Sequence, residues 1–326
     1  MNILVVNRYQ ASNSPIIDDL IDNHKPVDVP INEYHIPNAY IGYYGYITKC
    51  FKNIEEIVSP RHYNFIRLSS VLSNYFLKKK IKIKRPAISI THGWYDNFYH
   101  FSQECIFKLF LLKDYLPTST LILPSKLSNF HKEWLNLFEI DEVIYLNENE
   151  IIDTPLAISC NFPNRDLNFH SEWLNDFRYW VLNKVKSSKV EGPKNIFIGR
   201  PKNSKRNIVN TNEVLFETVK YGYEYVEMED YSLNEQINLF NNADKIIAVH
   251  GAALSNLMFC KPNTKIIELT NVNYDVYCFY KLSKILNLNY QMLRCEDEIG
   301  ENSNFGYRDF KVDINELEKT ILKNEN

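Results

Sequence analysis

The sequence predicts an α/β protein built from two Rossmann-like lobes. Three observations lead to this prediction. Short aliphatic runs alternate with helical patterns in both halves of the 326-residue chain. Residues 245–269 have the pattern of a strand, a small-residue turn, a helix, a turn and a second strand, which is a βαβ unit. The Gly- and Pro-containing segment at 187–194 has the composition of a linker, so we expect lobes at 1–189 and 190–326.

The amino-terminal half begins with an apolar strand pattern and then becomes difficult to interpret. Residues 7–60 suggest short strands and loops, including the aromatic run IGYYGYI at 41–47, but indicate no chemistry. Beyond them the predicted strands are 3–6, 87–91, 121–124, 142–146 and 153–159, and the predicted helices are 65–77, 97–115, 129–138 and 171–186.

The carboxyl-terminal half alternates more regularly. Asn210 with Glu213, and Ser232 with Glu235, fit the capping pattern at a helix start. The predicted strands are 195–199, 223–228, 245–249, 265–269 and 290–294, and the predicted helices are 213–221, 233–242, 254–259, 275–286 and 314–322.

The charge content of the sequence excludes some classes of binding partner. The net charge is −3, which argues against general binding to nucleic acid. Six cations lie between Lys78 and Arg85, and we interpret them as a solvated loop or a charged edge strand. A peripheral contact with a membrane or an acidic acceptor is the alternative for that segment.

The cysteine spacing and the hydropathy of the sequence predict the cellular compartment. The six cysteines are widely spread without zinc-site spacing, as in a reduced cytosolic protein. The sequence shows neither a signal-peptide pattern nor an apolar run of membrane-spanning length. We therefore expect a cytoplasmic protein, with a peripheral position at the inner face of the membrane as the alternative.

The βαβ unit contains a candidate anion site. Gly251 follows a buried strand and precedes a helix, and such a helix start at the carboxyl edge of a parallel sheet can bind a pyrophosphate. Arg200 leaves a strand at the same predicted edge, Arg206 lies in the loop after it, and Glu268 could accept hydrogen bonds from a ribose. The alternative is an ordinary buried strand turn.

A second candidate site lies at the start of the helix after residue 97. His100 and Glu104 are one turn apart on one helix face, so they could act as a general base and its orienting partner. Glu104 is the first candidate for the base, His100 the second and Asp96 the third. The alternative is a core histidine beside a surface acid. Asn97 could cap this helix or contact an acceptor.

Three blocks of the chain together resemble glycosyltransferase family 61. Ile196–Arg200 with Arg206 and the Asn210–Glu213 segment looks like the "strand, Arg, R-x-x-x-N-x-x-E" block of that family. The segment VHGAALSNLMFCKPNTKIIEL is similar to its H-G-A-G-L-A-N signature, and NFYHFSQECIFKL resembles its N-x-x-H-aromatic block. Departures are Ala253, Ser255 and Phe107, and Asn263 where Gly is usual; Asn also enters the left-handed conformation readily.

The resemblance implies an inverting glycosyltransferase of GT-B architecture that uses a nucleotide-diphosphate sugar, commonly a UDP-sugar, without an obligatory metal or other cofactor. By position, the nucleotide would contact Arg200, Arg206, His250, Gly251, Ala252 and Glu268. His100 and Glu104 would lie near a glycan or lipid-linked acceptor, with Asp96 and Asn97 on the same acceptor side. Capsule or surface polysaccharide synthesis is the expected setting; a non-catalytic sugar-nucleotide or glycan-binding protein and a sugar-nucleotide epimerase are the alternatives.

Overall fold

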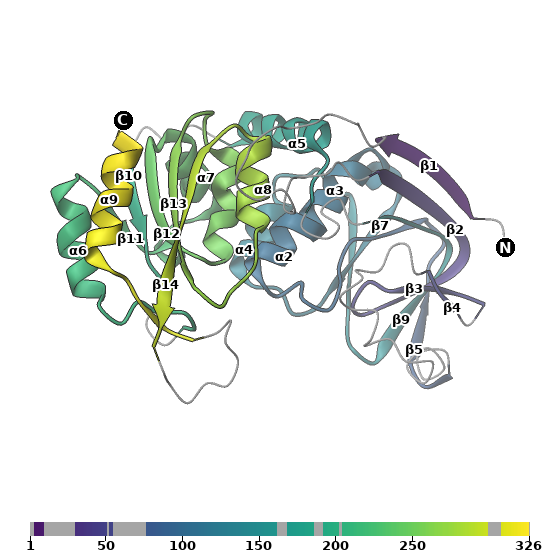
Figure 1. Cartoon of the computed structure of the whole chain (residues 1–326). Helices are drawn as coiled ribbons and strands as arrows, with labels where there is room; N and C mark the ends of the chain where they lie inside the picture. Colours follow the sequence, from purple (N-terminus) through teal and green to yellow (C-terminus); the bar gives the residue numbers. More distant parts are fainter. Residues whose placement is uncertain are drawn as a thin grey trace. The chain divides into compact units, whose positions relative to one another are not determined.

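The computed structural model describes residues 3–9, 30–50, 52–54, 76–161, 168–185, 192–201, 204–298 and 308–325. These residues divide into two compact units of mixed α/β structure, one up to Tyr179 and one from Trp180 (Figure 1). Most of the predicted helix at 65–77 and of the predicted linker at 187–194 lies outside the described residues.

The second unit contains a six-stranded sheet in which all five predicted strands are present. The strand order is β11 (Glu224–Val226), β10 (Asn195–Ile198), β12 (Lys245–Val249), β13 (Lys265–Asn271), β14 (Asn289–Asp297) and β15 (Phe310–Lys311). The pairs from β11 to β14 are parallel, and only β15 is antiparallel to its neighbour. The central strands are aliphatic because a parallel sheet is covered on both faces.

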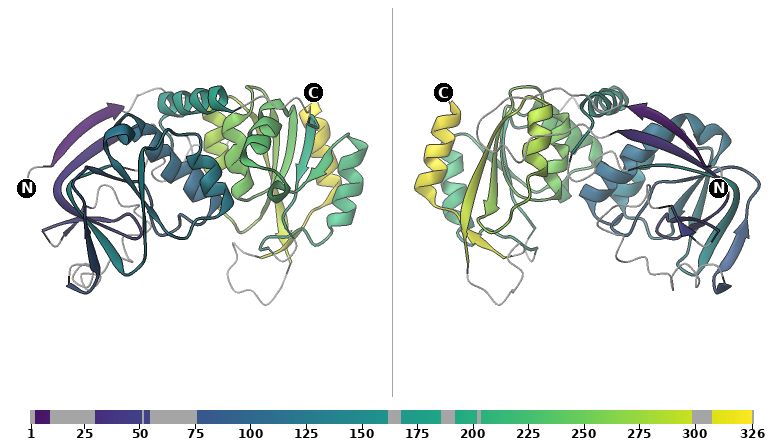
Figure 2. Two further views of the ribbon diagram at one scale, coloured as in Figure 1. Left: turned by 180° about the vertical axis from the view of Figure 1, so that it is seen from behind. Right: turned by 45° about the vertical axis from the view of Figure 1, so that its right-hand side comes forward.

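Helices cover both faces of this sheet, as Figures 1 and 2 show. On one face lie α6 (Thr211–Lys220) and α9 (Ile314–Glu325), and on the other α7 (Leu233–Asn242), the 3-10 helix η8 (Ala252–Phe259) and α8 (Cys278–Ile285); a 3-10 turn, η7, spans Met228–Asp230. Ile247, Ile267 and Leu317 are fully buried in the core beneath α6 and α9. The sheet is therefore a three-layer, Rossmann-like support for whatever lies at its strand ends.

Two helix caps were predicted in this unit, and the structure confirms one and corrects the other. The Ser232–Glu235 capping box at the start of α7 is present, as predicted. The Asn210 prediction was wrong in its chemistry: this residue occupies the N-cap position of α6, but its side chain makes no cap bond. Instead, the Asn210 amide exchanges two hydrogen bonds with the backbone of Val312, which ties the start of α6 to the carboxyl-terminal segment.

The first unit contains a nine-stranded mixed sheet and departs from a simple Rossmann plan. The order is β4 (Lys52–Asn53), β3 (Ile47–Lys49), β2 (Ile31–Gly42), β9 (Glu150–Cys160), β6 (Ala87–Ser89), β7 (Thr120–Pro124) and β8 (Glu142–Leu146), with β1 (Leu4–Tyr9) on β2 and β5 (Lys79–Lys82) on β9. The pairs among β5 to β9 are parallel, whereas β1, β3 and β9 all pair antiparallel with β2.

The sequence did not predict the long strand β2. Its twelve residues carry a proline and an irregular mixture of polar and aromatic side chains rather than a clean alternation. Pairing along almost the whole of β9 is what keeps this segment extended.

One continuous helical segment follows β6, as predicted from Asn97 onward. It runs through α2 (Phe98–His100), a π-helical turn η4 (Phe101–Cys105), α3 (Ile106–Leu112) and the 3-10 helix η5 (Lys113–Thr118). The other helices of this unit are α4 (Asn129–Leu135) and α5 (Ser171–Lys184), which extends into the second unit. Phe107 packs with ring centroids 4.4 Å from Trp173 and 4.6 Å from Phe177, so α3 and α5 share a buried aromatic core.

The cationic segment at 78–85 contains the edge strand β5, Lys79–Lys82, in agreement with the interpretation from the sequence. Its lysines at 79, 80, 82 and 84 are exposed, while Ile81 and Ile83 pack against the core.

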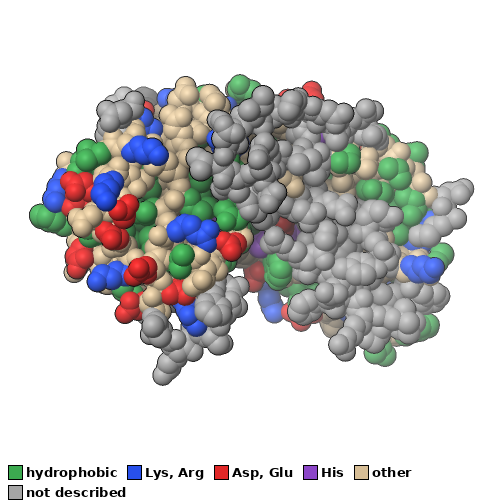
Figure 3. Space-filling model, in the orientation of Figure 1, with side chains coloured by type: hydrophobic (Ala, Val, Ile, Leu, Met, Phe, Trp, Pro, Cys, Tyr) green, Lys and Arg blue, Asp and Glu red, His purple; other side chains and the backbone are tan. Residues whose placement is uncertain are grey.

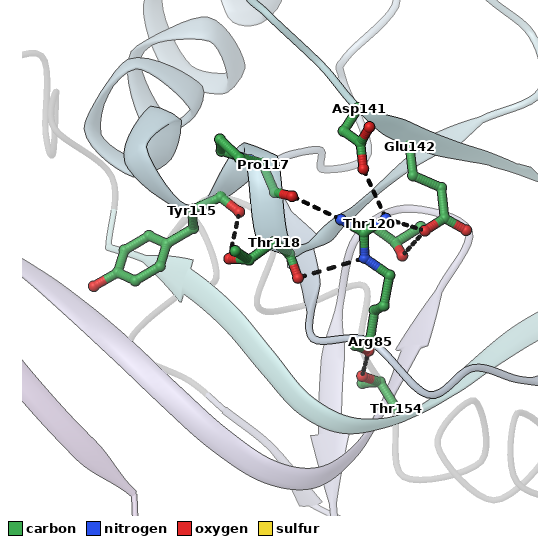
Figure 4. Close-up of polar contacts among 8 residues, drawn as sticks. All are labelled: Arg85, Tyr115, Pro117, Thr118, Thr120, Asp141, Glu142 and Thr154. Atoms are coloured by element: carbon green, nitrogen blue, oxygen red, sulfur yellow. Dashed lines mark hydrogen bonds and ion pairs between the residues drawn. The ribbon is translucent and has the colours of Figure 1, made fainter.

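Arg85 has a different role, which Figure 4 shows. Its guanidinium donates to Asp141 at 2.8 Å, to Glu142 at 3.0 Å and to the Pro117 carbonyl at 2.9 Å, joining β8 to the end of η5.

The charge distribution on the surface and the state of the cysteines agree with what the composition of the sequence indicates. On the face seen in Figure 3, basic and acidic side chains are interspersed over the described part of the second unit. Among the described residues, no helix combines the length and apolar character that crossing a bilayer requires. All six cysteines are free thiols, and only Cys50 is exposed.

We expect Arg85→Ala to lower the thermal unfolding midpoint of the first unit by a few degrees, because it leaves Asp141, Glu142 and the Pro117 carbonyl without their shared donor. Lys84→Ala, which removes an exposed neighbouring cation, is the matched control and should leave the midpoint unchanged. Equal midpoints for the two variants, measured by scanning calorimetry, would show that the network does not stabilise the unit.

Candidate active site

Three strand ends converge at one edge of the second unit's sheet. Ile198 of β10 is in register with Ala248 of β12, and Ala248 is in register with Glu268 of β13. Because parallel strands point the same way, the residues that follow β10 and β12 emerge side by side. Arg200 and His250 are those residues, so the sheet brings together two segments that lie 50 residues apart in the sequence.

Arg200 contacts the backbone of the turn after β12. Its Nη1 donates to the carbonyl oxygen of His250 at 3.0 Å, and its Nε donates to Ser204 Oγ at 3.2 Å. Gly251 has an extended backbone that any residue can adopt, with φ of 179°. A Cβ there would nevertheless lie 2.4 Å from Arg200 Nη1, so any other residue would force the guanidinium to move from this position.

Arg206 brings a second cation to this edge. Its backbone is in the left-handed region, with φ of +67°, and its guanidinium lies 5.1 Å from the centre of the Tyr274 ring. The Tyr274 ring in turn contacts His250, with ring centroids 4.8 Å apart. Burial, reinforced by the charge of Arg206, lowers the pKa of Arg200 to about 10, so Arg200 still carries its charge at neutral pH.

Neither Arg200 nor Arg206 forms an ion pair with any carboxylate among the residues that the structure describes. Two partly buried guanidinium groups without such a partner leave positive charge at a sheet edge that also exposes a helix start. This arrangement is suited to a diphosphate, which planar guanidinium groups and backbone N–H groups bind together.

Glu268 lies directly beneath this edge and is fully buried. One carboxylate oxygen pairs with Nδ1 of His250, and the other accepts the hydroxyl hydrogen bond of Tyr290. Both oxygens are therefore used inside the protein, which favours positioning of His250 over the expected contact with a ribose. Ala252, the remaining predicted nucleotide residue, is half-buried and opens η8.

The first unit brings the other predicted pair together. His100 Nδ1 lies 2.9 Å from Glu104 Oε2, one turn further along the helical segment. Glu104 belongs to the π-helical turn, and such turns redirect side chains and recur at functional sites. His92, from the loop after β6, places its Nε2 2.8 Å from the same Glu104 oxygen. The carboxylate is thus held between two imidazole rings.

Hydrogen bonding fixes the charge state of this cluster. Burial raises the pKa of Glu104, but hydrogen bonds and charge from His100 and His92 outweigh it and hold that pKa well below its usual range. Burial lowers the pKa of His92, partly offset by Glu104. His92 Nδ1 accepts from the backbone N–H of Trp94 at 3.4 Å, so its proton sits on Nε2, toward Glu104.

The same three residues are the candidate metal ligands in the described part of the chain. One donor atom from each of His92, His100 and Glu104 lies within 4.8 Å of the others. Two imidazoles and a carboxylate match the ligand chemistry of a three-ligand zinc site. The sequence analysis did not recognise this set, because His92 lies outside the helix and at no regular spacing from the other two.

The two residues predicted to lie on the acceptor side have different environments. The Oδ1 of Asn97 accepts from the backbone N–H groups of Tyr99 and His100, at 2.9 and 3.4 Å, so this side chain caps the helical segment. Asp96 is exposed. Sequence reasoning missed His92, Tyr274 and Tyr290. A histidine directly after a predicted strand was a usable signal for the first, whereas the two tyrosines gave none.

Comparison with known proteins adds an independent finding. The family pattern Glycosyltransferase 61 matches residues 98–267, more than half of the chain. The EGF domain-specific O-linked N-acetylglucosamine transferase of Gallus gallus is 25% identical over 167 residues, which is 45% of this chain. The protein of the same name from Pan troglodytes is 24% identical over 165 residues. The match spans 30% and 31% of those two relatives, respectively.

The family match begins at the α2 helix and ends within β13, so it includes His100, Glu104, Arg200, Arg206 and His250. On this match, the chain belongs to glycosyltransferase family 61.

Proposed function

We propose that this protein is an inverting glycosyltransferase that moves a sugar from a nucleotide-diphosphate donor, a UDP-sugar, to a hydroxyl group of an acceptor. The observation that carries this is the pair of guanidinium groups at the carboxyl edge of the second unit's sheet, in a chain of family 61. N-acetylglucosamine is the first donor sugar to test, because the curated relatives are named for its transfer.

On the donor side, Arg200 and Arg206 would bind the diphosphate and neutralise the charge that grows on it as the glycosidic bond breaks. Gly251 leaves room for Arg200, and the start of η8 at Ala252 offers backbone N–H groups. Glu268 and Tyr290 would act by positioning, since they hold the His250 ring and thereby the turn whose carbonyl Arg200 contacts.

On the acceptor side, we assign the base to His100 and the orienting role to Glu104, which reverses their order in the sequence analysis. A carboxylate whose pKa is held far below its usual range is a weak proton acceptor. His100 uses Nδ1 toward Glu104, and its Nε2 has no hydrogen-bond partner among the described residues. A carboxylate that orients an imidazole base recurs in hydrolases with a Ser-His-Asp triad.

We also propose that the reaction is metal-independent and takes place in the cytoplasm, in the synthesis of a capsule or another surface polysaccharide. The His92–Glu104–His100 cluster supports the first point, because the Glu104 carboxylate already has an imidazole nitrogen within 2.9 Å from each histidine. Six free cysteines support a reducing compartment.

We expect Arg200→Ala to weaken UDP binding by about 10- to 100-fold, since one charge-assisted contact is lost. Gly251→Ala should weaken it as well, because its Cβ would displace the guanidinium. Lys265→Ala removes a cation from the opposite, amino-terminal end of β13 and is the matched control. Titration calorimetry with UDP measures all three, and unchanged affinity for Arg200→Ala would exclude the proposed donor site.

His100→Gln should reduce kcat by about 10²- to 10⁴-fold, the usual contribution of a general base, while UDP affinity is retained. Despite burial, hydrogen bonds hold the pKa of Glu104 well below its usual range, so the Glu104 carboxylate stays charged and cannot itself cause a loss of activity as the pH falls from about 8 to about 5. Full kcat in His100→Gln would exclude His100 as the base.

Removing divalent ions with EDTA should leave sugar transfer unchanged if the cluster functions through its hydrogen bonds alone. Loss of activity on chelation, with recovery on adding Zn²⁺ or Mn²⁺, would contradict the metal-independent proposal. In that case His92→Ala, which removes one donor atom of the candidate ligand set, should abolish the recovery.

A further inference from the structure

Two segments lie against each other in the first unit, and the proposed reaction does not use their aromatic side chains. One is the turn between β2 and β3, Tyr43–Tyr46, and the other is the loop that follows β6, His92–Asn97. Ser89 Oγ donates to the Gly45 carbonyl at 2.7 Å, and the Tyr43 and Tyr95 hydroxyls are 2.9 Å apart. These contacts join segments that are about fifty residues apart in the chain.

Gly45 makes the close contact between the two segments possible. Its φ is +77°, and a Cβ there would lie 2.3 Å from the Thr91 carbonyl oxygen and 2.7 Å from Thr91 Oγ1. No other residue type fits that conformation and that space without strain. Burial raises the pKa of Tyr46 to about 12, and the nearby backbone of Gly93 offsets this in part. The turn is thus fixed against the loop that carries His92.

The aromatic side chains of these segments fall into two groups. Tyr43 and Tyr95 are buried, with 4% and 6% of their surface exposed, and support the turn. Tyr44 and Trp94 are 40% and 38% exposed, although they are large rings on well-fixed segments. Exposed aromatic rings that are already rigid lose little entropy on binding, which is typical of recognition surfaces.

The exposed Trp94 lies beside the proposed base. Its ring centroid is 4.9 Å from that of His100, and its backbone N–H donates to His92, the other imidazole of the cluster. The Tyr44 ring lies near the Tyr46 ring, with ring centroids 6.4 Å apart, and Tyr46 is close to the backbone of Gly93, the residue before Trp94. Asp96, between Trp94 and the helix start, is an exposed carboxylate.

We propose that Trp94 and Tyr44 form the acceptor subsite and that the acceptor is a saccharide. This inference rests on the proposed function, because it takes His100 as the group that receives the proton. A pyranose ring has an apolar C–H face that packs on an aromatic ring, and equatorial hydroxyls that need polar partners at the rim. Trp94 supplies the face next to His100, Asp96 supplies a hydrogen-bond acceptor, and Tyr44 supplies a second face for a neighbouring sugar.

The test measures saccharide binding directly, without donor or turnover. The full chain is examined by saturation-transfer NMR with methyl β-galactoside, methyl N-acetyl-β-glucosaminide and lactose as probes. We expect transfer to at least one probe, loss of affinity of about tenfold or more in Trp94→Ala and Tyr44→Ala, and partial retention in Trp94→Phe. Tyr145→Ala, an exposed tyrosine on β8 of the same unit, is the matched control and should bind as the unmodified protein does.

Kinetics provide the second readout. Trp94→Ala should raise the KM for the acceptor with little change in kcat or in UDP affinity, because it removes binding contact and not the base. No transfer to any probe, or unchanged binding in Trp94→Ala, would overturn the subsite. So would glycosylation of a folded protein domain with no saccharide acceptor. If saccharide binding depends on Trp94 while Arg200→Ala leaves UDP affinity unchanged, the subsite stands and the donor proposal fails.

Discussion

The proposed donor site depends on one contact, between the Arg200 guanidinium and the carbonyl oxygen of His250. That contact needs three conditions at once. The strands β10 and β12 must be parallel and in register, the turn after β12 must be held by the buried Glu268, and residue 251 must leave room for the guanidinium, which a Cβ there would displace. When all three hold, a long, flexible cation is fixed at the edge of a sheet before any ligand arrives, which reduces the ordering cost of binding.

Carboxylate–histidine pairs occur in both units, with different consequences. Glu268 is fully buried beneath His250 and bonds in addition to Tyr290, so the pair is closed and holds a backbone turn in place. Glu104 is bonded by two imidazoles, of which His92 is buried and His100 is partly exposed. The first pair therefore suits a positioning role, and the second leaves Nε2 of His100 without a hydrogen-bond partner in the part of the chain that the structure describes. Burial distinguishes the two pairs more clearly than residue type does.

The mixed sheet of the first unit explains how an aromatic surface can exist beside His100. The antiparallel strands β2 and β3 bring the Tyr43–Tyr46 turn against the loop after β6, which a parallel sheet with helical crossovers would not do. The departure from a simple Rossmann plan is thus the feature that places additional side chains near the proposed base. Gly45 is the residue that makes this packing sterically possible.

The sequence by itself determined the alternating elements, the five strands of the second sheet and the pairing of His100 with Glu104, because these follow from local periodicity and from helix spacing. It also placed Arg200 and Gly251 at strand ends, and Asn263 in the left-handed conformation, with φ of +68°. Only the tertiary structure decided that His92 joins the cluster, that Tyr290 occupies the second oxygen of Glu268 and that Asn210 bonds to Val312 instead of capping its helix. Such contacts join residues up to 102 positions apart, and their partners are chosen by sheet order and by burial, which no local pattern encodes.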